Sequence, residues 1–210
     1  MINEALISNA LPFIGKNLIS EIAESATIKD IEVGTVLLKE GQYVKVIPIV
    51  LSGLIKVFTT YQDKDLLLYY IQPNESCIMS FSAGLKNEPS RILAVTEEDT
   101  KAILIPTDKI NKWINEYPQL NTLFYQQYNL RYTELLDTIN HLLFDKMDKR
   151  LFDYLVKKVK LTNQNPLTIS HRQIATELGT AREVISRTIK KLESDNLVLQ
   201  HKSSIEILKL

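Results

Sequence analysis

The chain has 210 residues, of which 45% are hydrophobic and 24% are charged, with only 6 glycines and 7 prolines. This composition is typical of a globular protein and excludes a fibrous or wholly disordered chain. The length predicts one or two domains. The sequence lacks an apolar run near the roughly 20 residues of a membrane span. It also lacks a secretory signal, because its first residues have no basic start and no apolar stretch. We therefore predict a cytoplasmic protein without membrane association.

Cys77 is the single cysteine. It cannot form an internal disulfide, and one thiolate cannot hold an iron–sulfur cluster or a four-thiolate zinc ion within one chain. The sequence also lacks an HExxH motif, a phosphate-binding loop and a nucleophile–base motif. We predict no enzymatic activity and no cofactor.

The net charge of zero hides an asymmetry between two parts of the chain. Residues 145–210 hold 13 Lys and Arg against 8 Asp and Glu, a net charge of +5, and residues 1–144 have a net charge of −5. A basic C-terminal third favours one module that faces nucleic acid and another that faces something else.

Residues 1–30 show the apolar spacing of short helices, and residues 31–106 change to short runs of Val, Ile, Leu and Tyr. Turn signals separate the runs, among them Gly34, Gly41, Gly53 and Asn74. Closely spaced strands with such punctuation predict an antiparallel barrel or sandwich. The predicted strands are Thr35–Leu38, Val46–Leu51, Leu54–Thr60, Leu66–Ile71, Arg91–Thr96 and Lys101–Ile105.

The pattern becomes helical from about Thr107, and Pro118 suits a first helical turn. After it, side chains recur at alternating steps of four and three residues, which is a heptad rhythm. They are Phe124, Tyr128, Arg131, Leu135, Thr138 and Leu142. Periodicity alone leaves two interpretations open. The helix either packs on its own barrel or forms a dimer through a coiled coil, and the polar Arg131 and Thr138 weaken the second interpretation.

A further amphipathic helix is predicted over Asp145–Lys158, and two short helices follow it. Ser170 and Gln173 have the spacing of a capping box, and so do Thr180 and Glu183. Between them, Gly179 is placed to end the first helix in the left-handed conformation. Two short helices joined by a glycine turn predict a helix-turn-helix motif.

The second helix, predicted over residues 181–192, has one apolar and one polar face at 100° per residue. Arg182, Glu183, Ser186 and Arg187 share the polar face with Lys190. Arginine matches the acceptor edge of guanine and glutamate can accept from cytosine, so Arg182, Glu183 and Arg187 are predicted to contact bases in the major groove. For Glu183 the alternative is that it only caps the helix. Two short strands around residues 200–204 then predict a winged helix-turn-helix.

This C-terminal sequence resembles the CRP/FNR family of bacterial transcription regulators. The most specific stretch is Ile174-Ala175-x-x-Leu178-Gly179-Thr180-x-Arg182-Glu183-x-Ile185-Ser186-Arg187, followed by Leu192 and Asn196-Leu197-Val198. A weaker resemblance at Gly34, Glu40-Gly41 and Ser52-Gly53 extends it over essentially the whole chain.

The resemblance implies an α+β fold in three parts. They are a jelly-roll-like antiparallel β-roll sensor domain at residues 1–117, a long dimerisation helix at 118–144 and a winged helix-turn-helix DNA-binding domain at 145–210. It also implies a homodimer on a palindromic double-stranded DNA site and contact with RNA polymerase. Arg182, Glu183 and Arg187 match the family's base-reading positions, and Ser186 matches one used in the FNR branch. Phosphate contacts are expected from Ser170, His171, Arg172 and Thr180, which match family positions, and from Lys190 and Lys202.

The sequence departs from the family in the cyclic-nucleotide site. Where the family has Gly-Glu, this chain has Met79-Ser80, and its arginine position falls on Ser90 or Arg91. A degenerate pocket, or one for an unknown effector, is therefore expected at these four residues. The alternatives are a cyclic-nucleotide-responsive regulator and a haem- or redox-sensing regulator, for which Cys77 and His141 are candidates only by residue type. A further alternative is a module whose helix-turn-helix binds protein.

Overall fold

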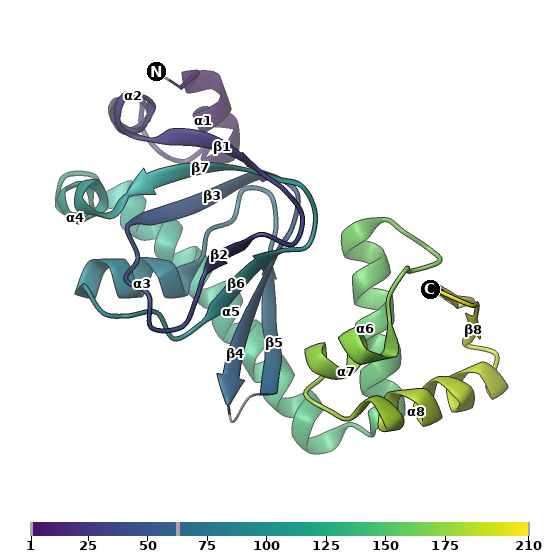
Figure 1. The fold of residues 1–210 in the computed structure, drawn as a ribbon. Helices are drawn as coiled ribbons and strands as arrows, with labels where there is room; N and C mark the ends of the chain where they lie inside the picture. The colour runs from purple at the N-terminus through teal and green to yellow at the C-terminus, as the bar shows by residue number, and fades with distance from the viewer. Residues whose placement is uncertain (1, 62–63, 210) are drawn as a thin grey trace. The chain divides into compact units, whose positions relative to one another are not determined.

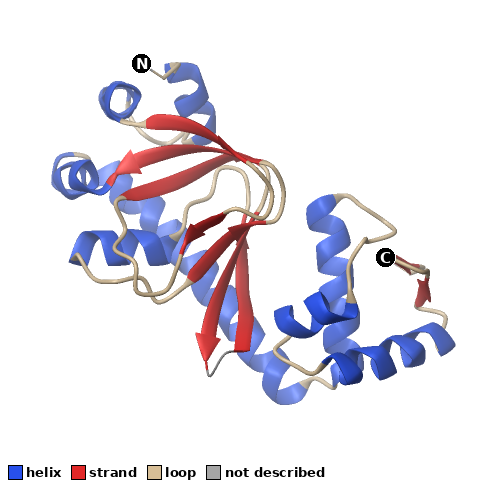
Figure 2. Cartoon of the chain, viewed as in Figure 1, coloured by secondary structure: helices blue, strands red, loops and turns tan. Residues whose placement is uncertain are grey.

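The computed structural model describes residues 2–61 and 64–209, with the backbone alone at 61, 64 and 141–143. The chain forms two compact units. One consists of residues 1–59 and 68–135, and the other of residues 60–67 and 136–210. The first unit combines β-strands with helices, and the second is mainly helical (Figure 2).

The N-terminal part begins with helices α1 (Glu4–Ala10) and α2 (Lys16–Ser25), as predicted. Strands, two further helices and the long helix α5 follow (Figure 1). Their bounds are β1 (Thr27–Ile31), β2 (Val36–Leu38), β3 (Val46–Ser52), β4 (Ile55–Tyr61), β5 (Lys64–Ile71), α3 (Ile78–Lys86), β6 (Leu93–Thr96), β7 (Thr100–Pro106), α4 (Thr107–Glu116) and α5 (Pro118–Phe144).

The strands form two sheets, which confirms the predicted β-roll. One sheet has the order β1-β7-β3 and the other the order β2-β6-β4-β5. The partners of β6 and β7 are antiparallel, with Ile49 opposite Ile103 and Val57 opposite Ala94. Because side chains alternate between the two faces of a strand, neighbouring residues of β3, Ile49 and Val50, serve two different cores.

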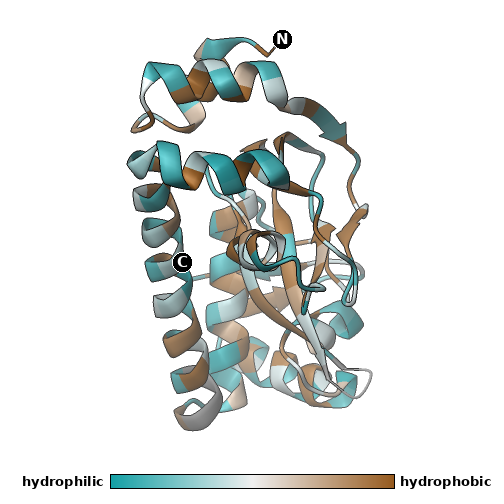
Figure 3. Ribbon diagram, turned by 90° about the vertical axis from the view of Figure 1, so that its left-hand side faces the viewer, coloured by the Kyte–Doolittle hydropathy of each residue, from teal (hydrophilic) through white to brown (hydrophobic). Residues whose placement is uncertain are grey.

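One core lies against helices and the other joins the two sheets. Ile47, Ile49, Ile103 and Ile105 pack with α1, α2, α4 and the start of α5 around Trp113. The second core draws side chains from β3, β4, β5 and β6. It consists of Val50, Ile55, Val57, Tyr69, Ile71, Cys77, Ile92 and Ala94. Hydrophobic residues are accordingly concentrated on the strands of the roll, whereas the surrounding helices alternate hydrophobic with hydrophilic residues (Figure 3).

Two predicted turn positions explain how the strands reverse. Gly53 has φ of +87°, and an added Cβ would lie 2.4 Å from the backbone oxygen of Asp99, so only glycine fits. Asn74 has φ of +69° between β5 and α3, which confirms that it takes a conformation otherwise favoured by glycine.

Two elements depart from the sequence prediction. Strand β1 spans Thr27–Ile31 and pairs along its length with β7, although residues 27–30 were expected to be helical. Residues Ile78–Lys86, for which no helix was predicted, form α3. Its N-cap is Cys77, whose sulfur accepts a hydrogen bond from the backbone N–H of Ser80 over 3.4 Å.

Helix α5 has the predicted bounds, but its heptad pattern divides between two environments. Phe124 is buried in the core of the first unit and stacks on Phe81. Arg131 is also buried and pairs with Glu75 and Glu134, so this member of the pattern is packed within its own unit. Tyr128 and Leu135 are exposed. Leu142, the last member of the pattern, lies outside the residues whose side chains are described.

The second unit contains α6 (Met147–Thr162), α7 (His171–Glu177), α8 (Arg182–Ser194), β8 (Val198–Gln200) and β9 (Ile205–Ile207). Strands β8 and β9 are antiparallel, with Val198 opposite Ile207. A core of Leu151, Leu155, Ile174, Ile185 and Ile189, with further apolar residues, holds the three helices and the hairpin together. This arrangement confirms the predicted winged helix-turn-helix fold.

Candidate nucleic-acid interface

Residues at the two ends of helix α7 determine where it begins and how the chain turns after it. The Ser170 hydroxyl accepts a hydrogen bond from the backbone N–H of Gln173 over 3.1 Å, which caps the helix. At the other end Gly179 has φ of +63°, and the N–H of Thr180 donates to the carbonyl of Ala175 over 2.9 Å. These bonds satisfy carbonyls at the end of α7 and reverse the chain toward α8.

The second predicted capping box does not form. Helix α8 has Ala181 as its N-cap, and no side chain caps it. Thr180 instead belongs to the turn, through its N–H bond to Ala175. Glu183 is therefore in the first turn of α8 without a capping partner at Thr180, and its side chain is exposed.

Helix α8 has two chemically different faces. Ile185, Ile189 and Leu192 are buried in the core of the unit. Three charged residues of the first two turns, Arg182, Glu183 and Arg187, are exposed, and so is Lys190. Ser186 is half-buried. The helix thus presents two guanidinium groups and a carboxylate on the side away from its core.

Helix α6 fixes the orientation of α7 through a buried polar network. The carboxylate of Glu177 accepts hydrogen bonds from Tyr154 over 2.6 Å and from Lys158 over 3.1 Å. Gln173, one turn before Glu177, also donates to this carboxylate. Both charged residues are buried, and the ion pair with its additional donors satisfies the carboxylate away from water.

Two further contacts from α6 reach the turn and α8. A guanidinium nitrogen of Arg150 donates to the carbonyl of Leu178 over 3.1 Å. Asp148 forms an ion pair with Lys191. The bond to Asp148 raises the pKa of Lys191, and the same bond lowers the pKa of Asp148.

His171 joins the start of α7 to α8. Its Nδ1 atom lies 2.9 Å from the Oγ atom of Ser186, and the two share a hydrogen bond. Burial lowers the pKa of His171, and the positive charge of Arg182 lowers it further. The lowered pKa favours the neutral ring, and its hydrogen bond holds the side chain of Ser186.

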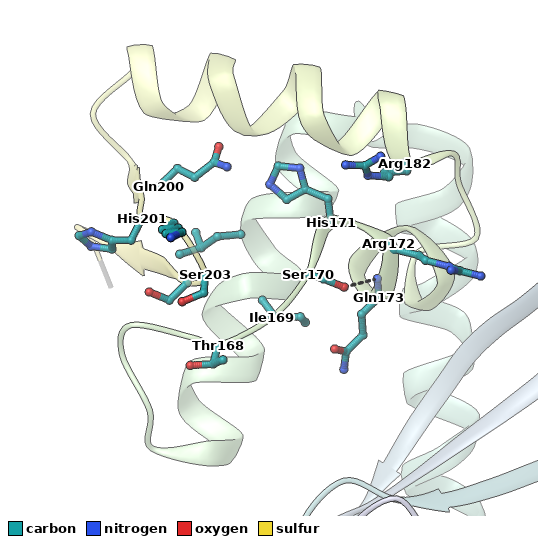
Figure 4. Close-up of a pocket in the computed structure, with 13 residues that line it drawn as sticks. Thr168, Ile169, Ser170, His171, Arg172, Gln173, Arg182, Gln200, His201 and Ser203 are labelled. Carbon is teal, nitrogen blue, oxygen red and sulfur yellow. Dashed lines mark hydrogen bonds between the residues drawn. The ribbon is translucent and has the colours of Figure 1, made fainter.

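A cavity of about 670 Å³ lies between the start of α7, the start of α8 and the wing. Figure 4 shows His171 and Arg182 beside α8, with Gln200 and His201 on the wing side. Its lining is polar and basic and contains no Asp or Glu. The residues that line it are Thr168, Ile169, Ser170, His171, Arg172, Gln173, Arg182, Gln200, His201, Lys202, Ser203, Ser204 and Ile205.

Comparison with known proteins agrees with this geometry. The model of the Crp-like helix-turn-helix domain matches residues 149–210. Residues 149–210 are a Crp-like helix-turn-helix domain. Among curated protein sequences, none matches the chain.

The whole chain also has solved structural relatives. A protein from Eubacterium rectale, named as a regulator of the crp/fnr family, has 20% identity and a TM-score of 0.87, covering 96% of this chain and 95% of that one. The c-di-GMP-responsive global regulator CLP of Xanthomonas campestris has 16% identity and a TM-score of 0.81, covering 93% and 100%. A CRP/FNR family regulator from Thermus thermophilus has 19% identity and a TM-score of 0.76, covering 88% and 94%. The predicted resemblance to the CRP/FNR family is confirmed at the level of the fold.

Within the Crp-like domain, the predicted phosphate-contacting residues divide into two groups. The first group lines the cavity beside α8 together with Arg182 and consists of Ser170, His171, Arg172 and Lys202. Thr180 and Lys190 do not line it. Gln200 and Ser203, which were not predicted, face the same space from the wing. Both lie within two residues of Lys202, and this position could have indicated that they share its site.

The effector pocket expected at four residues of the roll stays a prediction. Ser80 lines a cavity of the first unit, but Met79, Ser90 and Arg91 do not. The Ser90 hydroxyl instead bonds the backbone of Ile92, and Arg91 is exposed. The side chain of His141, the haem-ligand candidate, lies outside the described residues.

The described residues also bear on other classes of function. Among them, groups of three or more His, Cys, Asp or Glu that could hold a metal ion are absent. None of the described helices combines the length and the apolar character needed to cross a membrane.

Proposed function

We propose that the chain is a homodimeric, sequence-specific DNA-binding transcription regulator whose helix α8 enters the major groove. The observation that carries the proposal is the exposed group of Arg182, Glu183 and Arg187 on the first turns of the second helix of a Crp-like domain. Arginine donors match guanine O6 and N7, and the carboxylate accepts from the cytosine amino group.

The basic cavity beside α8 supports the same proposal. Ser170, His171 and Arg172 belong to α7 or its cap, and Lys202 to the wing, so a phosphate backbone passing the start of α8 would meet donors from both sides. The net charge of +5 in residues 145–210 favours such an anionic partner. Contact with RNA polymerase remains a prediction.

The test selects a preferred duplex from a random library and compares its affinity with that of random DNA at fixed salt. A homodimer should select an inverted repeat. Arg182→Ala and Arg187→Ala should each lose about 1–3 kcal/mol of discrimination at one base pair. Lys16→Ala, which removes an exposed positive charge from the first unit, serves as the control.

Failure would be plain in the same assay. If the unaltered chain bound selected and random duplexes equally, or if both arginine variants kept full discrimination, base contact by α8 would be wrong. Duplex binding without any dependence on salt would favour the alternative in which the domain binds protein.

A further inference from the structure

The roll of the first unit contains a cavity of about 590 Å³, which falls within the range of about 300–1,000 Å³ that holds small-molecule ligands. Its walls come from both sheets, from the segment of residues 41–46 and from the start of α3. The lining includes residues that are far apart in the sequence, such as Ile31 and Leu104. Side chains alternate along β3 and β7, so Val46, Pro48 and Leu104 point away from the core around Trp113 and line this cavity.

The inner wall is apolar and its mouth is apolar as well. Ile55, Ile71 and Ala94 are buried at the wall. Val36, Tyr43 and Val46 are exposed by 44%, 58% and 40%, and all three line the same cavity. Exposed apolar side chains gathered at the opening of a cavity are typical of a binding site, because a ligand would remove them from water.

The charged groups of this cavity have a single sign. Lys29 and Lys45 line it, and neither has a carboxylate partner among the described residues. The lining contains no Asp, Glu or Arg. Both lysines are exposed, so their ammonium groups stand at the mouth of an apolar space and attract an anionic group.

From the apolar lining and the two lysines we infer that the roll binds a medium-chain carboxylic acid. Its hydrocarbon body would lie in the cavity and its carboxylate near Lys29 and Lys45. The inference goes beyond the proposed function, and its test uses no DNA, so failure of one is distinguishable from failure of the other. It also differs from the site expected by resemblance, of which only Ser80 lines the cavity.

The first experiment titrates the full chain with octanoate, decanoate and decanol by calorimetry, below the concentrations at which they form micelles. Decanoate should bind saturably. Each added methylene should strengthen binding about four-fold, so decanoate should bind about 15-fold more tightly than octanoate. Decanol, which has the same chain without the charge, should bind about two- to five-fold more weakly than decanoate. A double variant with Lys29→Gln and Lys45→Gln should remove that difference.

The second experiment locates the ligand. Ala94→Leu adds bulk to the inner wall and should abolish decanoate binding. Because that change can disturb packing, Val46→Ser provides an independent test at the exposed mouth, where it should weaken binding at least four-fold. Val33→Ser, at an exposed valine outside the cavity lining, is the matched control and should bind decanoate normally.

Three results would overturn the inference. They are no saturable heat with decanoate, equal or tighter binding of decanol by the unaltered chain, and undiminished decanoate affinity in Val46→Ser. Circular dichroism establishes that each variant is folded before its titration is interpreted.

Discussion

At the scale of single residues, Glu177 is the position whose loss should most damage the Crp-like domain. Its carboxylate neutralises buried Lys158 and accepts from Tyr154 and Gln173. Glu177→Gln keeps the shape but leaves the ammonium group of Lys158 without this counter-charge. We expect the free energy of unfolding to fall by about 3–5 kcal/mol, the cost of breaking a buried pair.

Urea denaturation monitored by circular dichroism measures this free energy. Tryptophan fluorescence would not report on the domain, because the only tryptophan, Trp113, lies in the other unit. Glu206→Gln is the control because its pair with His201 is exposed and should contribute below about 1 kcal/mol. Equal effects of the two substitutions would contradict the role given to Glu177.

His171 gives a prediction for pH. Burial and Arg182 lower its pKa in the folded state, whereas the unfolded chain has an ordinary value of about 6.5. Between these two values the unfolded state binds more protons than the folded state. The contribution of His171 to stability is therefore present above about pH 6.5 and is lost as pH falls toward the lowered pKa.

The measurement is the free energy of unfolding of the unaltered chain and of His171→Gln across that range. The unaltered chain should lose stability more steeply as pH falls. Parallel curves would show that His171 does not titrate as described.

At the scale of elements, helix α5 carries apolar residues that its own chain leaves exposed. They are Tyr125, Tyr128, Leu130, Tyr132, Leu135, Leu136, Ile139 and Phe144. In the proposed homodimer part of this surface would pack against the partner, as the heptad spacing of Tyr128 and Leu135 favours.

Leu135→Glu would bury a carboxylate in that contact and should convert the dimer to a monomer at micromolar concentration, as measured by sedimentation. Gln126→Glu adds the same charge at an exposed polar position of α5 and should leave the dimer intact. A dimer that survives Leu135→Glu would place the subunit contact elsewhere.

The elements also show what sequence patterns could predict. Apolar periodicity predicted α5 and the two helices of the helix-turn-helix, and the Ser170 cap and the Gly179 turn predicted the ends of α7, because these signals are local. Strand β1 was missed because Thr27–Ile31 contains two charged residues and acquires its conformation by pairing with β7. Helix α3 was missed because its cap is Cys77, an uncommon capping residue, and its sequence includes Gly84.

The candidate site was predictable where it depends on local spacing. A spacing of 100° per residue identified the exposed charges of α8, since helix periodicity is local. The grouping of Ser170, Arg182 and Lys202 around one cavity depends on how the wing folds back, which no spacing encodes. Arg131 illustrates the limit in the first unit, because its partner Glu75 lies 56 residues away in the sequence.

At the scale of the whole molecule, the division of charge predicts how DNA binding responds to salt. The positive charge is concentrated in residues 145–210 although the chain is neutral overall. Binding to any duplex should weaken steeply as salt increases, and Lys202→Ala should weaken binding uniformly across sequences while reducing the slope by about one ion. Filter binding at several salt concentrations measures both. A change confined to one DNA sequence would make Lys202 a base contact instead.

The buried thiol of Cys77 has a practical consequence. It is the only sulfhydryl of the 210 residues, and it stands in the wall of the roll's cavity. Because this thiol is buried, a thiol reagent can reach it only when the roll opens locally. The rate of its alkylation with and without decanoate would therefore report whether the ligand keeps the roll closed.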